Sequence, residues 1–272
     1  MDRRIVFLIL AIAIAFPLLK PIGLISKPGE NVKKLFNFME KLPAGSKIFL
    51  SFDYDPSSMP EVHPAAVAIL VHAFKKGLHP ICGANWPFGG DMADMALKSA
   101  LEKTPEREKL LEGRDYANLG FQPGVLSKIK VMSKDLLAPF QNDRHGRPTK
   151  SMEIFQTPPN KQLSLRDFSL ILSFSAGAAG IGSFISTSGE HGVPISGACT
   201  SISIPDFITF VQTGQLTGLI GGMPGAAEYE VLLNYTGMAG KAMDSQSMGH
   251  LAILFLILAG NLFDFIKKKS NV

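Results

Sequence analysis

The sequence predicts an α/β fold in which a duplicated βαβ (Rossmann-like) unit forms a mostly parallel sheet, flanked by N- and C-terminal transmembrane helices. Three observations lead to this prediction. Each end of the chain has a long apolar segment beside basic residues, the middle alternates between strand-like and helix-like segments, and two short motifs recur in the same order. We divide the 272 residues into an N-terminal anchor (1–27), a first α/β half (28–137), a polar loop (138–166), a second half (167–246) and a C-terminal helix with a basic tail (247–272).

The N-terminal apolar segment covers residues 5–19 and follows Arg3 and Arg4. With residues 21–26 it extends past Lys20, whose aliphatic stem can reach the membrane interface. A cleaved signal peptide shares the basic start and the apolar core, but no small-residue cleavage site of the A-x-A kind follows here. We therefore expect an uncleaved anchor.

The C-terminal apolar segment covers residues 251–266 and precedes Lys267–Lys269. With residues 247–250 it reaches the roughly 20 residues that a membrane helix needs. Asn261 and Asp264 interrupt it, which leaves a buried core helix as the alternative. The basic ends favour two spans with both tails in the cytoplasm and an extracytoplasmic middle, although Lys20, Lys27, Lys33 and Lys34 weaken that count.

The charge balance separates the ends of the chain from its middle. The whole chain has 27 Lys+Arg and 23 Asp+Glu, a net charge of +4. Without the membrane flanks, 21 basic and 21 acidic residues remain. A neutral body gives no basic surface for nucleic acid, so the partners we expect are the lipid bilayer and homo- or hetero-oligomeric membrane proteins. The 26 Gly, 18 Pro and two Cys exclude collagen and a disulfide-rich scaffold.

Apolar periodicity and Pro/Gly breaks predict the elements of the middle. The first half contains expected helices at 31–42, 60–76, 91–103 and 125–137 and strands at 47–52, 79–83 and 116–119. After the polar segment, predicted as a loop or lid, the second half contains strands at 168–174 and 193–197 and helices at 176–186 and 204–219. A further helix restarts near 226–230.

The internal repeat joins the two halves. Leu50-Ser51-Phe52 recurs as Leu172-Ser173-Phe174, and residues 79–84 (HPICGA) recur as 193–198 (VPISGA). Two matches in the same order on corresponding elements indicate a duplicated βαβ unit. In parallel sheets, ligands bind beyond the carboxyl ends of the strands at a point where the strand order reverses.

That rule selects the candidate residues after the strands. Asp53 and Asp55 could share a cation or act in acid–base chemistry, although Asp before Pro is also a common turn device. Asn85 and Trp86 follow the next strand, where the only Trp lines a pocket, docks a neighbour or packs in the core. Ser175 holds the corresponding place in the second half.

Gly177, Gly180 and Gly182 follow a strand and precede a helix, where backbone amides could bind an anion. Their spacing is not the G-x-G-x-x-G of dinucleotide sites, and close packing is the alternative interpretation. The chain has no P-loop, no G-x-S-x-G and no CxxC, and its six His are scattered. We expect no cofactor and no metal.

Cys82 and Cys199 lie at the second strand of each half. They are inert core thiols, a disulfide, or, for Cys199 before a helix, a nucleophile. Gly214 and Gly218 have the small-xxx-small spacing of close helix contacts, and Glu228 begins the helix that follows. We assign Gly214, Gly218 and Glu228 to an interface.

Three functions fit this reading. The first is a membrane-anchored, non-catalytic α/β subunit of a larger membrane-associated assembly. The second is a small-ligand-binding or sensor module with Asp53, Asn85, Trp86, Ser175 and Cys199 between the halves and residues 138–166 as a lid. The third is a membrane-tethered hydrolase or transferase that uses Cys199. We favour the first, since no complete catalytic constellation is evident.

Overall fold

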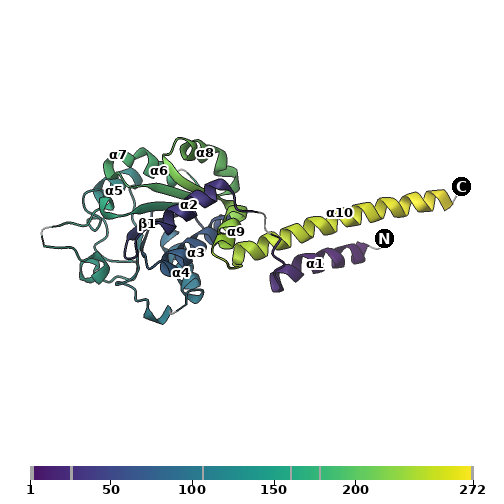
Figure 1. The fold of residues 1–272 in the computed structure, drawn as a ribbon, viewed down its shortest axis with the longest axis horizontal. Helices are drawn as coiled ribbons and strands as arrows, with labels where there is room; N and C mark the ends of the chain where they lie inside the picture. Colours follow the sequence, from purple (N-terminus) through teal and green to yellow (C-terminus); the bar gives the residue numbers. More distant parts are fainter. Residues whose placement is uncertain (1–2, 25–26, 106, 160, 178, 271–272) are drawn as a thin grey trace.

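Six parallel strands form one sheet in the order β3-β2-β1-β4-β5-β6 (Figure 1). The computed structural model describes the chain except residues 1–2, 25–26, 106, 160, 178 and 271–272. The α/β prediction with a parallel sheet is confirmed, and each half of the chain supplies three neighbouring strands. The strands are β1 (Lys47–Asp53), β2 (His79–Ala84), β3 (Ala117–Phe121), β4 (Leu170–Ser175), β5 (Ile195–Cys199) and β6 (Leu216–Gly221).

Helices cover both faces of the sheet. Because parallel strands need crossovers, their two faces are both buried, and two apolar clusters form, one on each face. The first cluster joins the sheet to α2 (Glu30–Glu40), α3 (Met59–Lys75), α4 (Gly89–Glu102) and α9 (Gly222–Leu232). The second joins it to α5 (Val125–Met132), α6 (Ile181–Ser186) and α8 (Ile204–Gln212). Short α7 (Ser188–His191) leads toward β5.

The repeated motifs occupy equivalent register positions. Leu50, Ser51 and Phe52 of β1 pair with Leu172, Ser173 and Phe174 of β4. Leu50 also pairs with Cys82 of β2, and Leu172 pairs with Ser196 of β5, the residue that matches Cys82 in the repeat. The sequence repeat therefore coincides with a geometric one at the centre of the sheet.

The predicted helix over 204–219 is wrong in its second part. The helix α8 ends at Gln212, and β6 follows as an edge strand. Gly214 lies between them with a φ of 78°, a left-handed conformation that glycine adopts without strain and that ends the helix. Gly218 lies in β6, where a Cβ would come within 2.6 Å of the Leu35 amide nitrogen of α2. Gly214 and Gly218 therefore do not form a helix-packing motif.

The polar segment 138–166 packs against the body. It contains the short 3-10 helices η2 (Thr149–Ser151) and η3 (Glu153–Phe155). Several of its side chains are buried in the second apolar cluster: Phe140, Met152, Ile154, Phe155, Leu163 and Leu165. Turn-rich sequence hides these anchors, because they follow neither a helical nor a strand period.

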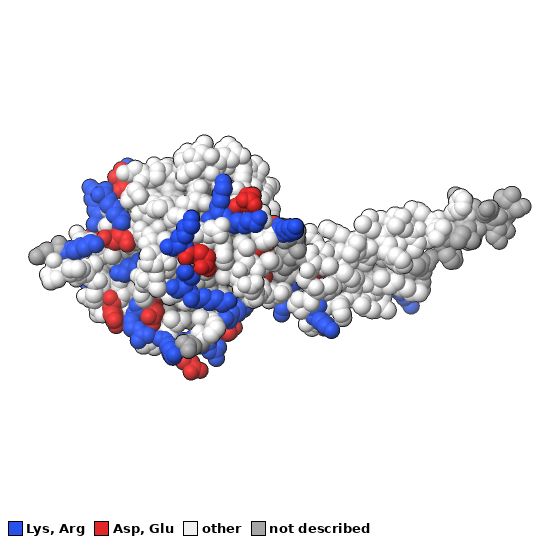
Figure 2. All heavy atoms as spheres, viewed as in Figure 1, with Lys and Arg blue, Asp and Glu red and all other residues white. Residues whose placement is uncertain are grey.

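The two terminal helices lie side by side and project from the body beside α9 (Figure 1). We call α1 (Arg3–Leu19) and α10 (Met238–Ser270) the terminal helix pair. Among the described helices, one is long and apolar enough to cross a membrane, over Met238–Leu262. The helix α1 has 17 residues. Figure 2 shows few charges on the pair, whereas Lys, Arg, Asp and Glu are common on the body.

Carboxylates connect the terminal helix pair to the body. Buried Glu230 of α9 accepts hydrogen bonds from the amides of Gly237, Ala239 and Gly240, at the start of α10. Asp244 of α10 accepts the amides of Ile22, Gly23 and Leu24, which follow α1. Helix N-termini leave such amides without partners, so Glu230 fixes the direction in which α10 leaves α9.

Candidate functional site

The strand order places the candidate site between β1 and β4. The chain runs outward from β1 to β3 on one side and from β4 to β6 on the other, so the order reverses where these two strands pair. At the carboxyl ends of the pair, Asp53 stands opposite Ser175. Two residues that the sequence selected separately thus meet at the switch point of the sheet.

Asp53 is buried and fully hydrogen-bonded to its neighbours. Its Oδ1 accepts the Asn85 amide at 2.7 Å, and its Oδ2 accepts the Ser173 hydroxyl at 2.8 Å. The Asn85 side chain donates to Ser51 Oγ at 3.1 Å. Burial raises the pKa of Asp53, while these hydrogen bonds and the Lys128 charge act in the opposite direction. The carboxyl group therefore ties β1 to β2 and β4.

Lys128 of α5 supplies a buried cation near this carboxylate. Its Nζ donates to the carbonyl oxygens of Ala84, at 2.6 Å, and Gln122, at 2.8 Å. The ammonium lies 5.9 Å from the ring centroids of both Phe121 and Phe140. Burial lowers the pKa of Lys128 to about 8, and Asp53 opposes that shift. The charge of Asp53 therefore has a buried counterpart within the protein.

A cavity of about 300 Å³ opens beside Asp53 at the switch point. Its walls come from the loops after β1, β2 and β4: Asp53, Tyr54, Asp55, Ser58, Trp86, Ala176, Gly177 and Ala179. Trp86 is 42% exposed. Of the five residues expected between the halves, Asp53 and Trp86 line this cavity. Asn85 and Ser175 do not line it but donate hydrogen bonds to the lining residues Asp53 and Gly177. Cys199 lies in β5, two strands from β1. No described residue of 138–166 lines it.

Asp55 is a turn residue as well as a cavity residue. Its Oδ1 accepts the Ser57 amide at 3.0 Å and the Ser57 hydroxyl at 2.6 Å. Hydrogen bonds from Ser57 and Ser58 lower the pKa of Asp55, opposed by slight desolvation. This carboxylate is consequently ionised at neutral pH and gives the cavity a negative charge.

Tyr54 turns its hydroxyl inward from the cavity wall. It lies 2.7 Å from Nδ1 of His63, a buried residue of α3. Burial lowers the pKa of His63 to about 4, and the Lys103 charge acts in the same direction. The ring is neutral at physiological pH, and the pair fixes the phenol in place.

The glycine loop contributes space rather than an anion site. Gly177 lines the cavity, and the Ser175 hydroxyl donates to its carbonyl oxygen at 2.7 Å. A Cβ on Gly180 would collide with Ser173 and Ser175, whereas one on Gly182 would meet nothing. Since α6 has only six residues, its dipole is short. Close packing explains Gly180, and the anion-binding interpretation gains no support from this geometry.

Both cysteines are free and buried. Cys82 lies in β2 and Cys199 in β5, with β1 and β4 between them. Three strand spacings amount to about 14 Å, beyond the reach of a disulfide, so the disulfide alternative is wrong. Burial raises the pKa of Cys199 to about 12, with Asp206 and Glu61 adding to the effect. A protonated core thiol gives no support to nucleophilic catalysis.

Glu228 lies apart from the switch point. Its Oε2 accepts the Gly29 amide at 2.9 Å, where the chain enters α2. The same carboxylate borders a shallow hollow with Gly29, Ser201, Gly221 and Pro224. Glu228 therefore belongs to the junction between the terminal helix pair and the body.

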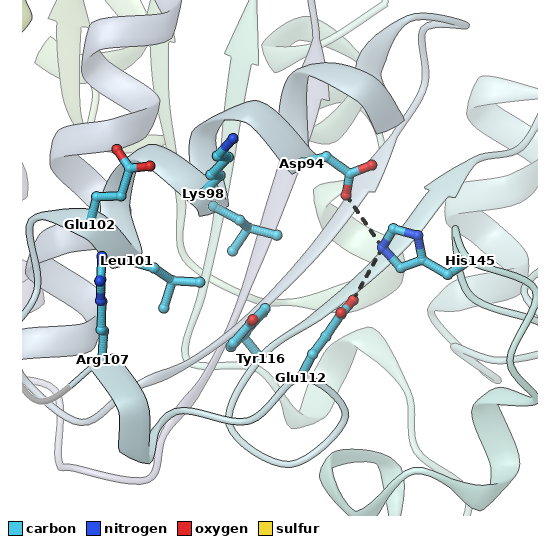
Figure 3. Close-up of a pocket in the computed structure, with 9 residues that line it drawn as sticks. Asp94, Lys98, Leu101, Glu102, Arg107, Glu112, Tyr116 and His145 are labelled. Atoms are coloured by element: carbon cyan, nitrogen blue, oxygen red, sulfur yellow. Dashed lines mark ion pairs between the residues drawn. The ribbon is translucent and has the colours of Figure 1, made fainter.

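A second cavity, of about 480 Å³, lies between α4 and the loop before β3 (Figure 3). His145 Nε2 lies 3.7 Å from Asp94 and 3.6 Å from Glu112, and Figure 3 shows the ring between the two carboxylates. Arg147 also pairs with Glu112 at 2.8 Å. Charges of both signs compensate one another here, so this cavity selects no ligand charge.

Lys128, Tyr54 and Ser173 also belong to the surroundings of the cavity, and no sequence motif marks them. One indication was present for Lys128, since it falls on the same helical face as Val125, Ile129 and Met132. A lysine on an apolar face is buried only with partners, and those partners are backbone carbonyls that no sequence pattern reveals.

Comparisons with family models, with curated proteins and with solved structures found no match to this chain. The fold and the geometry of the switch-point cavity therefore carry the functional argument. The chain is an α/β protein with the strand order of the doubly wound nucleotide-binding folds, and Asp53 and Asp55 stand at the end of β1, where those folds have a phosphate-binding loop.

Proposed function

We propose that this protein is a membrane-tethered module that binds a small organic cation at the switch point of its sheet. The observation that supports this most is the cavity of about 300 Å³ that Asp53, Asp55 and Trp86 line at the carboxyl ends of β1 and β2. Ligand sites of α/β sheets lie at this position, and such volumes suit small ligands.

The sign of the ligand charge follows from the lining. Asp55 is ionised and supplies the negative charge of the lining, because Lys128 compensates the charge of Asp53. No Lys or Arg lines the cavity among the described residues. Phosphate would be repelled at the place where nucleotide-binding folds attract it with glycine amides. The indole of Trp86 offers a face to which ammonium and guanidinium groups bind.

A thermal-shift panel tests this proposal. We expect choline, ethanolamine or agmatine to raise the melting temperature of the purified protein saturably, and ATP and NAD to leave it unchanged. Asp55→Asn and Trp86→Ala should remove the shift, whereas Asp206→Asn, which changes an exposed acid of α8, should keep it. Saturable stabilisation by the nucleotides, or an undiminished amine shift in both cavity variants, contradicts the proposal.

We also propose that both terminal helices span the membrane and that the body lies outside the cytoplasm. Large apolar side chains are exposed on both helices, including Phe7 and Leu8 of α1 and Phe255 and Leu258 of α10. Exposed apolar surface of this kind favours lipid over water. Ser188→Cys, exposed in α7 before β5, tests the orientation: an impermeant maleimide should label it in intact cells, and labelling only after lysis contradicts the orientation.

The equivalent register of the repeated motifs supports a duplicated βαβ unit.

A subunit role in a membrane assembly is the second candidate function, and the exposed apolar side chains of the terminal helix pair favour it, because neighbouring membrane helices pack on such surfaces. Native mass measurement in mild detergent tests the subunit role separately from ligand binding. A monomer at working concentration contradicts the assembly and leaves ligand binding intact.

A further inference from the structure

The linker from α1 joins the body at the carboxyl edge of the sheet. Glu228 accepts a hydrogen bond from the Gly29 amide there. The hollow beside it includes Ser201, which follows β5, and Gly221, which ends β6. Asp244 of α10 holds Leu24. Leu24 and Gly29 are five positions apart in the sequence, so at most about 18 Å of extended chain joins them. The carboxyl edge at β5 and β6 is therefore within that distance of Asp244.

Beyond Asp244, most of the large side chains described on the terminal helix pair are apolar and exposed. The remainder of α10 to Ser270 is about 39 Å long, enough to cross a bilayer. Large apolar side chains are exposed from Leu251 onward. Figure 1 shows the pair projecting away from α5 and α7, at the end of the body where α9 lies. A bilayer around the pair would therefore begin close to the carboxyl edge.

The loops at this edge are nearly without charge. They comprise residues 54–58, 85–88, 122–124, 176–180 and Thr200, and Asp55 is their only charged residue. Large apolar side chains are exposed among or beside them: Ile202 at 87%, Phe88 at 52% and Trp86 at 42%. Such residues are typical of contacts with the membrane interface, where Trp is enriched.

The charge of the second half agrees with this placement. Residues 168–227 contain only Glu190 and Asp206 as charged residues, and Figure 2 shows a largely uncharged surface over α6 and α8, with charged side chains where the body meets the terminal helix pair. The ion pair of Arg144 with Asp91 also lies at the carboxyl edge, but at the ends of β2 and β3, on the side of the sheet away from β6 and the linker.

We propose that the carboxyl edge of the sheet rests on the bilayer surface, with Ile202 and the Trp86–Phe88 loop in contact with lipid, so that the switch-point cavity opens into the headgroup layer. This rests on the proposed membrane insertion of α10. The surface that covers the carboxyl edge is the lipid interface. A ligand of the cavity then arrives along the membrane rather than from bulk water.

Trp86 is the only Trp of the chain, so its emission reports this contact directly. The full chain is reconstituted into vesicles of phosphatidylcholine brominated near the headgroup end of the acyl chains, and compared with unbrominated vesicles. We expect Trp86 to lose about half of its emission in brominated lipid and to resist quenching by aqueous iodide. Unchanged emission in brominated lipid, together with full quenching by iodide, overturns the inference.

Three variants in the Trp86→Phe background make the outcome specific. Ile202→Trp should be quenched by brominated lipid like Trp86. Leu111→Trp, which is exposed in the loop leading into β3 at the amino edge, should not be quenched. Phe255→Trp reports insertion of α10. If Phe255→Trp is quenched and Trp86 is not, the proposed edge contact is wrong and the membrane tether stands; if neither is quenched, the tether itself is wrong.

Discussion

The two halves of the sheet share a register and differ in chemistry. Leu50-Ser51-Phe52 and Leu172-Ser173-Phe174 pair residue by residue, yet the next position is Asp53 in β1 and Ser175 in β4. The first half (28–137) contains 27 charged residues, and the second (167–246) contains seven. The comparison teaches that two halves with the same strand register can differ in charge, with the acidic cavity wall on the first half and few charged residues on the second.

Replacing the matched pair at the strand ends should give the largest difference between the halves. Asp53→Ala leaves the Asn85 amide, the Ser173 hydroxyl and the buried Lys128 charge without their partner. We expect a loss of about 3–5 kcal/mol in the free energy of unfolding. Ser175→Ala removes two local hydrogen bonds, both with Gly177, and should cost about 1 kcal/mol. Chemical denaturation measures both, and equal losses would contradict the asymmetry.

The pH dependence of stability also compares the two halves, because each contains a buried histidine: His63 in the first and His191 in the second. Because burial lowers the pKa of His63 to about 4, the unfolded chain binds a proton more readily than the folded one between pH 6.5 and 4. Stability is therefore complete above pH 6.5 and falls by about 3 kcal/mol as the pH drops through that window.

His63→Gln should flatten this step in denaturation curves recorded from pH 4 to 7. His191 of the second half is the control, since burial also lowers its pKa but its ring contacts only backbone. If His191→Gln removes the step and His63→Gln leaves it, the assignment to the first half fails.

Lys128→Met separates packing from charge at the cavity. Methionine fills the space beside Phe121 and Phe140 but leaves the carbonyl oxygens of Ala84 and Gln122 without their donor. We expect a loss of about 1–2 kcal/mol and a further rise in the pKa of Asp53. Lys130→Met, on the exposed side of α5, should change stability by less than about 0.5 kcal/mol. Similar losses of stability in both variants would contradict the role given to Lys128 at the cavity.

The cysteines should show no difference between the halves. Cys82 and Cys199 are both buried, and burial raises the pKa of each thiol. Neither should react with a thiol reagent in the folded protein, and both should react after unfolding. Rapid labelling of Cys199 alone in the native state would revive its role as a nucleophile.

Periodicity and breaks in the sequence predicted five of the six strands and the switch-point residues Asp53, Asn85, Trp86 and Ser175. The sixth strand, β6, escaped because TGLIG has the small residues of a helix interface, and only the backbone at Gly214 ends the preceding helix. The order of strands, the anchors inside 138–166 and the carbonyl partners of Lys128 depend on long-range packing. No local pattern encodes those contacts.

Titration of Trp86 emission with choline, ethanolamine and agmatine in the full chain tests the central claim, cation binding in the acidic cavity, most directly. The account predicts a saturable change in emission with at least one of these probes, lost in Asp55→Asn and retained in Asp206→Asn. A change that never saturates, or an identical curve in Asp55→Asn, would contradict it.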